Sequence, residues 1–349
     1  MNNKIAIFSD THFGRQKNDE KILNYSIEYI KNIMIPNLKS QNITNIFFLG
    51  DLFDNRNLIN VKVQNDLYDL FSNDFKDFQI YMLIGNHDTY YSNTTDTYSS
   101  KQFKSFKNIH IIEKFETINI ENFKILMVSW LTNNSELQNI INCNPADVLM
   151  GHFDILGFHF NQHKICESGI DHNIFVDKFQ SVFSGHFHKQ SEMIVNNTKI
   201  CYIGAPWQID RNDIGESRGF IIYDIKNTSI ERIQNLNSPK FINLNYPEIS
   251  ENIINNFVDI TIKYNPENFE FEKENYNKYI ETIETFKPFK LAIYYEAQLH
   301  NNLNPKNCVF SFKNLKDSFY KYLQQKNENE IIEMHYKFSQ EFDKEMSRS

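Results

Sequence analysis

Short apolar runs recur along the first two-thirds of this chain, and most of them end in the same few kinds of polar residue. The runs are KIAIF at 4–8, NIFFL at 45–49, IYMLI at 80–84, KILMV at 124–128, DVLM at 147–150 and SVF at 181–183. Their length and their Ile, Val, Phe and Tyr content predict buried strands. Helical spacing of apolar residues appears between them at 19–39 and 59–75, and more weakly at 97–107 and 133–142. Alternating strands and helices indicate an α/β fold.

The pattern changes at about residue 189, where short strands follow one another closely. EMIV at 192–195, KICYIG at 199–204 and GFIIYDI at 219–225 are separated by turns, some of them rich in Asn. This spacing predicts a meander that completes a second sheet. The polar stretch at 226–247 is the expected domain boundary.

A smaller unit is expected beyond that boundary. Strands are predicted at 258–264 and 291–299, with a charged helix at 271–285 between them, which together indicate an α+β unit. Two amphipathic helices are expected after Pro305, near 312–326 and 328–343.

Charge and cysteine content narrow the function classes. The net charge of -8 argues against a protein that coats nucleic acid through bulk positive charge, so any polyanion must be held locally. The four cysteines are widely spaced and indicate neither a zinc knuckle nor a disulfide framework. No apolar run approaches the roughly 18 residues of a membrane span. We therefore expect a cytoplasmic protein with no membrane association.

Metal-ligating residue types follow five of the predicted strands. The motifs are Ser9-Asp10-Thr11-His12, Gly50-Asp51, Gly85-Asn86-His87-Asp88, Gly151-His152 and Ser184-Gly185-His186-Phe187-His188. Ligands of open α/β sheets bind outside the carboxyl ends of the strands, so these side chains should surround one crevice. Asp, Asn and neutral His suit Mn, Fe or Zn. The pattern predicts two divalent cations bridged by Asp51, and hydrolysis of a phosphoester.

With these five motifs the chain resembles the calcineurin-like metallophosphoesterases. Within that family it is most similar to the DNA double-strand-break repair nucleases of the SbcD type, and especially to the phage T4-type recombination endonuclease subunit. The closer resemblance rests on GDLFD at 50–54, GHF at 151–153 with GF at 157–158, SGHFH at 184–188, and YIGAPW at 202–207 with RGF at 218–220.

The resemblance implies a fold and a division into domains. The fold would be a sandwich of two mixed sheets flanked by helices, with a small α+β capping domain and C-terminal helices. Residues 1–225 would form the nuclease domain, 226–304 the capping domain that positions DNA, and 305–349 the helical segment that binds an ATPase. Only the first of these carries specific motifs, whereas the remainder matches in layout.

The resemblance also implies a role for each motif residue. One cation would be held by Asp10, His12, Asp51 and His188, and the other by Asp51, Asn86, His152 and His186. His87 would protonate the leaving oxygen, and Asp88 could orient His87. Mn²⁺ is the first expectation for both cations, with Mg²⁺, Fe²⁺ or Zn²⁺ as alternatives.

One residue departs from the family pattern. Asp54 stands where many cellular relatives have a phosphate-contacting His, so the balance of exonuclease and endonuclease activity is left open. Asp54 could be a helix cap or a partner of a metal ligand. Lys101, Lys104 and Lys107 recur at helical spacing and are candidate contacts for DNA phosphates, with a solvated helix face as the alternative.

The implied function is a DNA nuclease that hydrolyses phosphodiester bonds in DNA end processing, recombination and repair. Its implied partner is an SMC-like coiled-coil ABC ATPase that would bind the C-terminal helices, although these could instead pack on the core. Relatives commonly dimerise, so a homodimer is left open, and a phage-encoded protein would act in the host cytoplasm. The alternatives are a small-nucleotide phosphodiesterase or another phosphatase of the same fold. A non-catalytic scaffold is disfavoured because every expected ligand is present.

Overall fold

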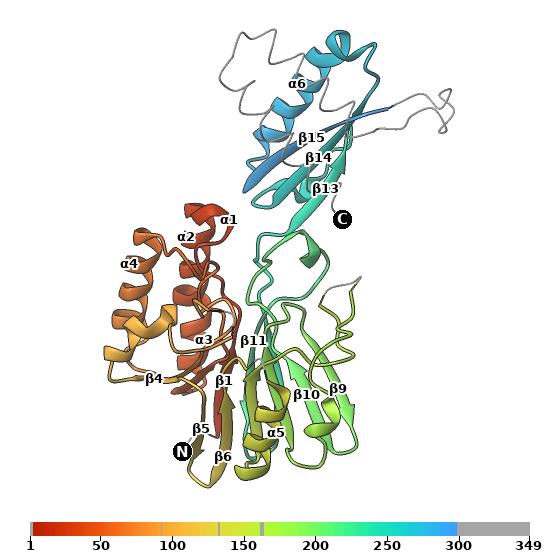
Figure 1. Ribbon diagram of the computed structural model, residues 1–349. Helices are drawn as coiled ribbons and strands as arrows, with labels where there is room; N and C mark the ends of the chain where they lie inside the picture. Colours follow the sequence, from red (N-terminus) through yellow and green to blue (C-terminus); the bar gives the residue numbers. More distant parts are fainter. Residues whose placement is uncertain (1–2, 92, 132, 161–163, 299–349) are drawn as a thin grey trace, which may run out of the picture. The chain divides into compact units, whose positions relative to one another are not determined.

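The computed structural model describes residues 3–91, 93–131, 133–160 and 164–298, and its main body is a sandwich of two six-stranded sheets (Figure 1). The first sheet has the order β12-β11-β1-β2-β3-β4, with β1 (Lys4–Phe8), β2 (Asn45–Phe48), β3 (Gln79–Leu83), β4 (Ile109–Ile112), β11 (Gly219–Asp224) and β12 (Ser229–Gln234). The second has the order β5-β6-β7-β8-β10-β9, with β5 (Phe115–Ile120), β6 (Phe123–Val128), β7 (Val148–His152), β8 (Ser181–Gly185), β9 (Ser191–Val195) and β10 (Thr198–Tyr202). Both sheets are mixed, as expected. In the first, β1 to β4 are parallel, β11 is antiparallel to β1 and β12 is antiparallel to β11. In the second, β6, β7, β8 and β10 are parallel, and the edge strands β5 and β9 are antiparallel to their neighbours.

One predicted strand lies in a different sheet from the one expected. Strands β9 and β10 join the second sheet through the tight turn at Asn196-Asn197, but β11 pairs antiparallel with β1 in the first sheet, where Ile5 lies opposite Tyr223. The prediction that 219–225 completes the second sheet is therefore wrong. The segment 203–218 between β10 and β11 is long enough to cross from one sheet to the other, whereas a hairpin turn is not.

Two long helical stretches follow β1 and β2, as the spacing predicted. The first consists of α2 (Glu20–Tyr29), the wider turn η1 (Ile30–Met34) and α3 (Ile35–Ser40), and the second of α4 (Val61–Asp69) and η2 (Leu70–Asp74). The side chains of Asp19 and Asn60 begin them by accepting from backbone N–H groups of the first turn. The weaker signal at 133–142 is α5 (Asn134–Cys143), whereas the one at 97–107 is a 3₁₀ helix, η3 (Ser99–Ser105). The remaining helical turns are α1 (Arg15–Asn18), η4 (His172–Ile174), η5 (Arg211–Asp213) and η6 (Glu251–Ile253).

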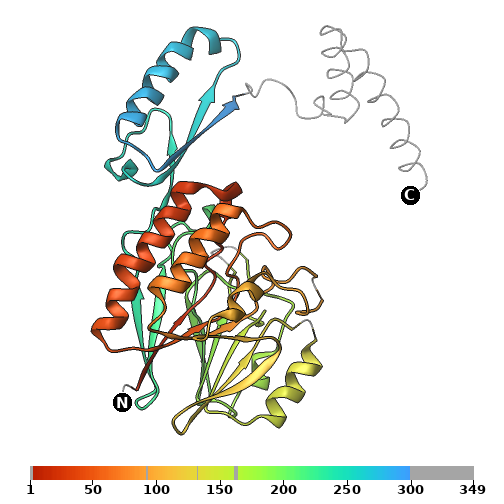
Figure 2. The ribbon, with the colours of Figure 1, turned by 90° about the vertical axis from the view of Figure 1, so that its left-hand side faces the viewer.

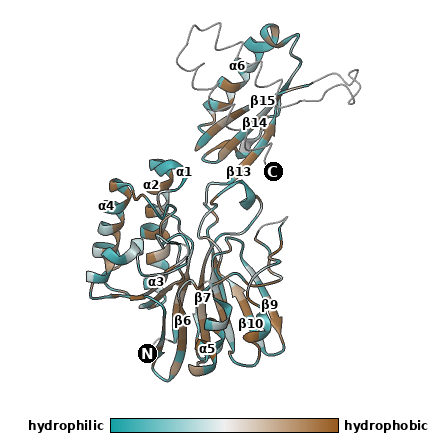
Figure 3. Cartoon of the chain, viewed as in Figure 1, coloured by the Kyte–Doolittle hydropathy of each residue, from teal (hydrophilic) through white to brown (hydrophobic). Residues whose placement is uncertain are grey.

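Alternate residues of each strand fill different cores. Ile5 and Ile7 of β1 pack between the sheets, while Ala6 and Phe8 pack under the helices of the first sheet. The far face of the second sheet is covered by α5 in the same way. Figure 2 shows the helices on opposite outer faces, and Figure 3 shows the hydrophobic strands between them. The result is four layers, helix on sheet on sheet on helix.

The predicted α+β unit is present after residue 240. A three-stranded sheet has the order β13-β14-β15, from β13 (Phe241–Asn245), β14 (Phe257–Tyr264) and β15 (Lys290–Ala297), with α6 (Phe269–Thr285) between the last two. Strand β13, which is parallel to β14, was not predicted.

Other expectations about organisation stay predictions. The domain boundaries at 225 and 304 are among them, and the two helices expected at 312–326 and 328–343 lie outside the described residues. Among the described residues, no helix has the length and apolar character needed to cross a membrane.

Candidate metal centre

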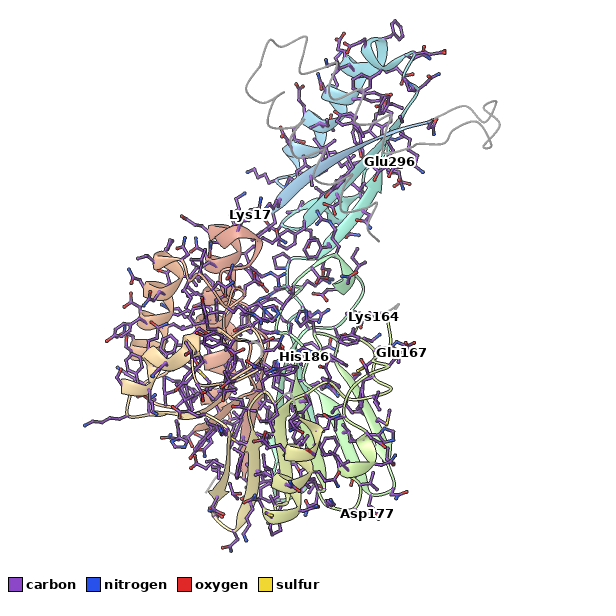
Figure 4. The ribbon with its side chains drawn as sticks, in the orientation of Figure 1. Lys17, Lys164, Glu167, Asp177, His186 and Glu296 are labelled. Atoms are coloured by element: carbon purple, nitrogen blue, oxygen red, sulfur yellow. The ribbon has the colours of Figure 1, made fainter. Side chains whose placement is uncertain are left out.

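The five motif-bearing strands end at one edge of the sandwich and are joined there by hydrogen bonds. The backbone N–H of Asp10 donates to the carbonyl of Gly50 at 3.0 Å, and that of His12 donates to the carbonyl of Asp51 at 3.1 Å. From the second sheet, the N–H of His186 donates to the Asp10 carboxylate at 3.0 Å. Figure 4 labels His186 at this meeting of the two sheets. The motifs therefore surround one site, as the sequence predicted.

A first group of potential ligands is formed by Asp10, His12 and His188, whose ligand atoms lie within 4.8 Å of one another. The Nε2 atoms of His12 and His188 are 3.1 Å apart, and Asp51 Oδ2 lies 3.6 Å from His12 Nε2. The buried Nδ1 atom of His12 has no hydrogen-bond partner among the residues that the structure describes. Two imidazole nitrogens that face each other beside two carboxylates suit a shared divalent cation.

A second group is formed by Asp51, His152 and His186, again within 4.8 Å. Asn86 Oδ1 lies 2.9 Å from both His152 Nε2 and His186 Nδ1, and Asp51 Oδ1 lies 3.4 Å from His152 Nε2. Asp51 thus turns one carboxylate oxygen toward each group. These His and Asp groups are able to hold a dinuclear metal site, with Asp51 between the two ions.

Burial and charge set the protonation of these groups. Burial lowers the pKa of His188 to about 3, with help from the Arg15 guanidinium, and it lowers the pKa of His12 well below its ordinary value. Both imidazoles are therefore neutral and can offer a lone pair. Burial acts on His152 in the same direction, but the Asp51 carboxylate outweighs it and raises the His152 pKa to about 9. A cation bound at His152 would displace that proton.

Four candidate ligands have backbone conformations that residues other than glycine rarely adopt. The φ angles are 55° at Asp10, 45° at His12, 57° at Asp51 and 89° at His186. The neighbouring Gly50 has a φ of +96°, and a Cβ atom there would lie 2.8 Å from both Gly85 Cα and His152 Nδ1. Strained backbone of this kind is typical of functional sites, where surrounding structure holds side chains in a required direction.

His87 lies at the same site, on the first-sheet side. Its backbone N–H donates to Asp51 Oδ1 at 2.9 Å, and its ring Nδ1 lies 2.8 Å from the carbonyl oxygen of Asp54. A carbonyl only accepts, so Nδ1 carries hydrogen and Nε2 is left to exchange a proton with a substrate. His87 also forms a group with His12 and Asp51 within 4.8 Å, so its assignment as a general acid stays a proposal.

The Asp88 side chain binds backbone N–H groups of two loops, whereas the sequence led us to expect that it orients His87. Its carboxylate is 1% exposed and accepts from the N–H groups of Asp51 at 2.8 Å, Leu52 at 3.0 Å and Gly85 at 2.9 Å. It therefore holds two metal-binding loops together, while the carbonyl of Asp54 orients the His87 ring. Burial raises the pKa of Asp88 to about 6. The structure therefore assigns the orientation of His87 to the Asp54 carbonyl and not, as expected, to Asp88.

Asp54 and Asp154 both lie beside metal-ligand candidates. Asn60 caps α4, so Asp54 is not that cap, and its Oδ1 lies 3.7 Å from Nδ1 of His12. Asp154 was missed by the sequence reasoning, and its Oδ1 lies 2.9 Å from His186 Nε2. This carboxylate leaves His186 Nδ1 facing the site, an arrangement common at metal-bound histidines. The only sequence signal was its position two residues after His152.

The three candidate DNA-contacting lysines lie around the 3₁₀ helix η3. Residues three apart align along such a helix, so Lys101 and Lys104 share one side, and Lys107 lies beyond its end. Lys104 forms an exposed ion pair with Glu113 at 2.8 Å. Their contact with DNA stays a prediction.

The fold and the site together define a metal-dependent phosphoesterase. The model of the calcineurin-like phosphoesterase family matches residues 3–190, and the chain belongs to this family. The resemblance seen in the sequence is thus confirmed at the level of the family.

Several solved structures are similar to this chain. A novel archaeal phosphodiesterase is 15% identical, with 66% of this chain and 99% of that chain covered and a TM-score of 0.36. A dimetal phosphatase from Danio rerio is 8% identical, with coverage of 64% and 92% and a TM-score of 0.43. GAP50, the anchor in the inner membrane complex of Plasmodium, is 13% identical, with coverage of 66% and 88% and a TM-score of 0.38. A search of the curated proteins found no match.

Proposed function

We propose that this chain is a DNA nuclease that uses two divalent cations, Mn²⁺ first among them, to hydrolyse phosphodiester bonds in DNA end processing, recombination and repair. The observation that carries the hydrolytic part is the placement of Asp51, whose two oxygens face separate groups of potential ligands. The DNA substrate is inferred from the motifs shared with SbcD-type nucleases.

The site suits cleavage of a phosphodiester within an acidic protein. Two divalent cations would neutralise phosphate oxygens and favour ionisation of a water molecule, and their charge exceeds that of the two carboxylates, Asp10 and Asp51. Positive potential would therefore be confined to the site, which agrees with a net charge of -8. His87 would protonate the leaving oxygen through Nε2, since its Nδ1–H is directed to Asp54.

Two residues from the stretches that resemble the SbcD-type nucleases contact the segments that carry candidate metal ligands. Trp207 packs against Phe13, which directly follows His12, with ring centroids 5.7 Å apart. Arg218 donates to the carbonyl of His188 and forms an ion pair with Asp213 at 2.7 Å. These residues are buried beside the segments that carry His12 and His188, and their contacts support the assignment of the ligands.

The decisive assay compares two substrates in the presence of Mn²⁺: linear duplex DNA and a mononucleotide phosphodiester. We expect degradation of the duplex, and loss of activity and of cation binding in Asp51→Asn. Turnover of the mononucleotide ester without any cleavage of DNA would instead identify a small-nucleotide phosphodiesterase of the same fold.

We further propose that the C-terminal segment binds an SMC-like ABC ATPase. The proposal is supported by the apolar spacing of its predicted helices, which is typical of segments that dock into a groove. Truncation at about residue 305 should abolish ATPase binding while metal-dependent cleavage of small phosphodiesters persists. Retention of ATPase binding by the truncated protein would refute it.

A further inference from the structure

Trp130 is placed at the metal centre by the same topology that places the candidate ligands. The parallel strands β6, β7 and β8 end at one edge, where β7 and β8 supply His152 and His186 and the end of β6 leads to Trp130. The N–H of Trp130 donates to the carbonyl of Ile84 at 2.8 Å. This bond ties Trp130 to the end of β3, directly before the loop that carries Asn86.

The indole ring borders the second group of ligands. Its centroid lies 5.3 Å from the ring of His186 and 6.0 Å from that of His152. Trp130 is partly exposed, whereas the other tryptophan, Trp207, is 2% exposed in the core. A partly exposed tryptophan thus lies beside two imidazoles of the metal centre.

A second partly exposed aromatic residue, Phe160, lies edge-on beside the His186 imidazole. The Phe160 centroid is 6.5 Å from that of His186, and Lys164 Nζ lies 5.1 Å from the Phe160 ring centroid. Lys164 and His186 are both labelled in Figure 4. Aromatic surface and a cation side by side are the features with which proteins bind single-stranded nucleic acid, since every base offers a π face.

We propose that Trp130 is a stacking platform for the nucleobase that flanks the scissile phosphate, with Phe160 bordering the same subsite. This inference rests on the proposed nuclease function and defines its substrate more narrowly. A base that stacks on the indole has left the duplex stack, so the site takes a frayed or single-stranded end in preference to a fully paired one.

The test uses two oligonucleotides that differ only in whether the nucleotide flanking the cleaved bond carries a base or is abasic. In wild-type protein, kcat/KM should be higher for the normal oligonucleotide. Trp130→Ala should lower the ratio of normal to abasic kcat/KM about tenfold, and Trp130→Phe should preserve most of it. Tyr68→Ala is the matched control, because Tyr68 is a 50% exposed aromatic residue on α4, and the ratio should not change there.

A binding measurement gives a second readout that does not depend on turnover. The chain has two tryptophans, so His87→Ala combined with Trp207→Phe leaves Trp130 as the sole tryptophan in a protein that should bind without cutting, and its emission can be excited selectively over that of the tyrosines. The normal oligonucleotide should quench its emission more strongly than the abasic one does.

The outcomes separate this inference from the function on which it rests. If Trp130→Ala lowers both rates by the same factor, or if both oligonucleotides quench equally, Trp130 only packs against the histidines and the inference is wrong. If wild-type protein cleaves neither oligonucleotide, the nuclease assignment fails and the inference fails with it.

Discussion

Replacing Asp154 with Asn should weaken one of the two cation sites and leave the other in place. The carboxylate accepts from Nε2 of His186 at 2.9 Å, which turns Nδ1 of that ring toward the site, 2.9 Å from Asn86 Oδ1. The amide of Asn can still accept this bond but carries no charge. The imidazole would then be a poorer electron donor to a cation at its Nδ1.

The expected size of the effect follows from the hydrogen bond and its exposure. A hydrogen bond to a charged group contributes about 1.5–3 kcal/mol. The side chain of Asp154 is 33% exposed, so solvent screening favours the lower end, and about 1.5 kcal/mol corresponds to roughly a tenfold loss of affinity. Asp154→Ala removes the acceptor as well and should cost more, up to about a hundredfold.

Calorimetric titration of metal-free protein with Mn²⁺ measures this directly, because the two sites should appear as separate binding steps. Glu167→Gln is the control, since it removes one negative charge from the same loop at an exposed position (Figure 4). Equal weakening of both steps would show a general electrostatic effect. Affinities within twofold of wild type at both steps would refute a role for Asp154 through His186.

Three further results are expected. His87→Ala should bind both cations and lose activity by about 10²–10⁴-fold, and surviving turnover in the metal-loaded variant would rule out a general acid at this position. Asp88→Ala removes the acceptor of four backbone N–H donors and should lower the free energy of unfolding of the metal-free protein by about 3 kcal/mol in urea titrations, where a change under 1 kcal/mol would contradict its role in joining the loops. Charge reversal at Lys101, Lys104 and Lys107 should weaken DNA binding and flatten its dependence on salt, whereas an unchanged affinity would reject these lysines as phosphate contacts.

The fold was predictable where the sequence pattern and the sheet geometry agree. The runs that precede Asp10, Asp51 and Asn86 are parallel strands of the first sheet, and those that precede His152 and His186 are parallel strands of the second, so within each sheet the residues that follow them had to meet at one edge. Strand β11 was assigned to the wrong sheet because an apolar run shows that a strand is buried but does not show which neighbour it pairs with.

The candidate site was predictable in its residues and less so in their contacts. Asp88 follows His87 directly, yet its side chain turns to the backbone of the Asp51 loop, because neighbouring residues in a sharp turn point in different directions. The sequence pattern around Asp154 and Trp130 gave little indication that these residues belong to the site. A lone carboxylate two residues after a histidine is common, and a lone tryptophan after an apolar run is more often a core residue.

Each proposed cation takes its ligands from both halves of the sandwich. Asp10, His12 and Asp51 follow strands of the first sheet, while His188 follows a strand of the second, and the other group is divided in the same way. Bound ions would therefore cross-link the two sheets at their shared edge, in addition to the apolar layer between them. A sliding movement of one sheet against the other would pull both coordination spheres apart together, so metal loading should raise the resistance of the whole sandwich to mechanical and thermal separation.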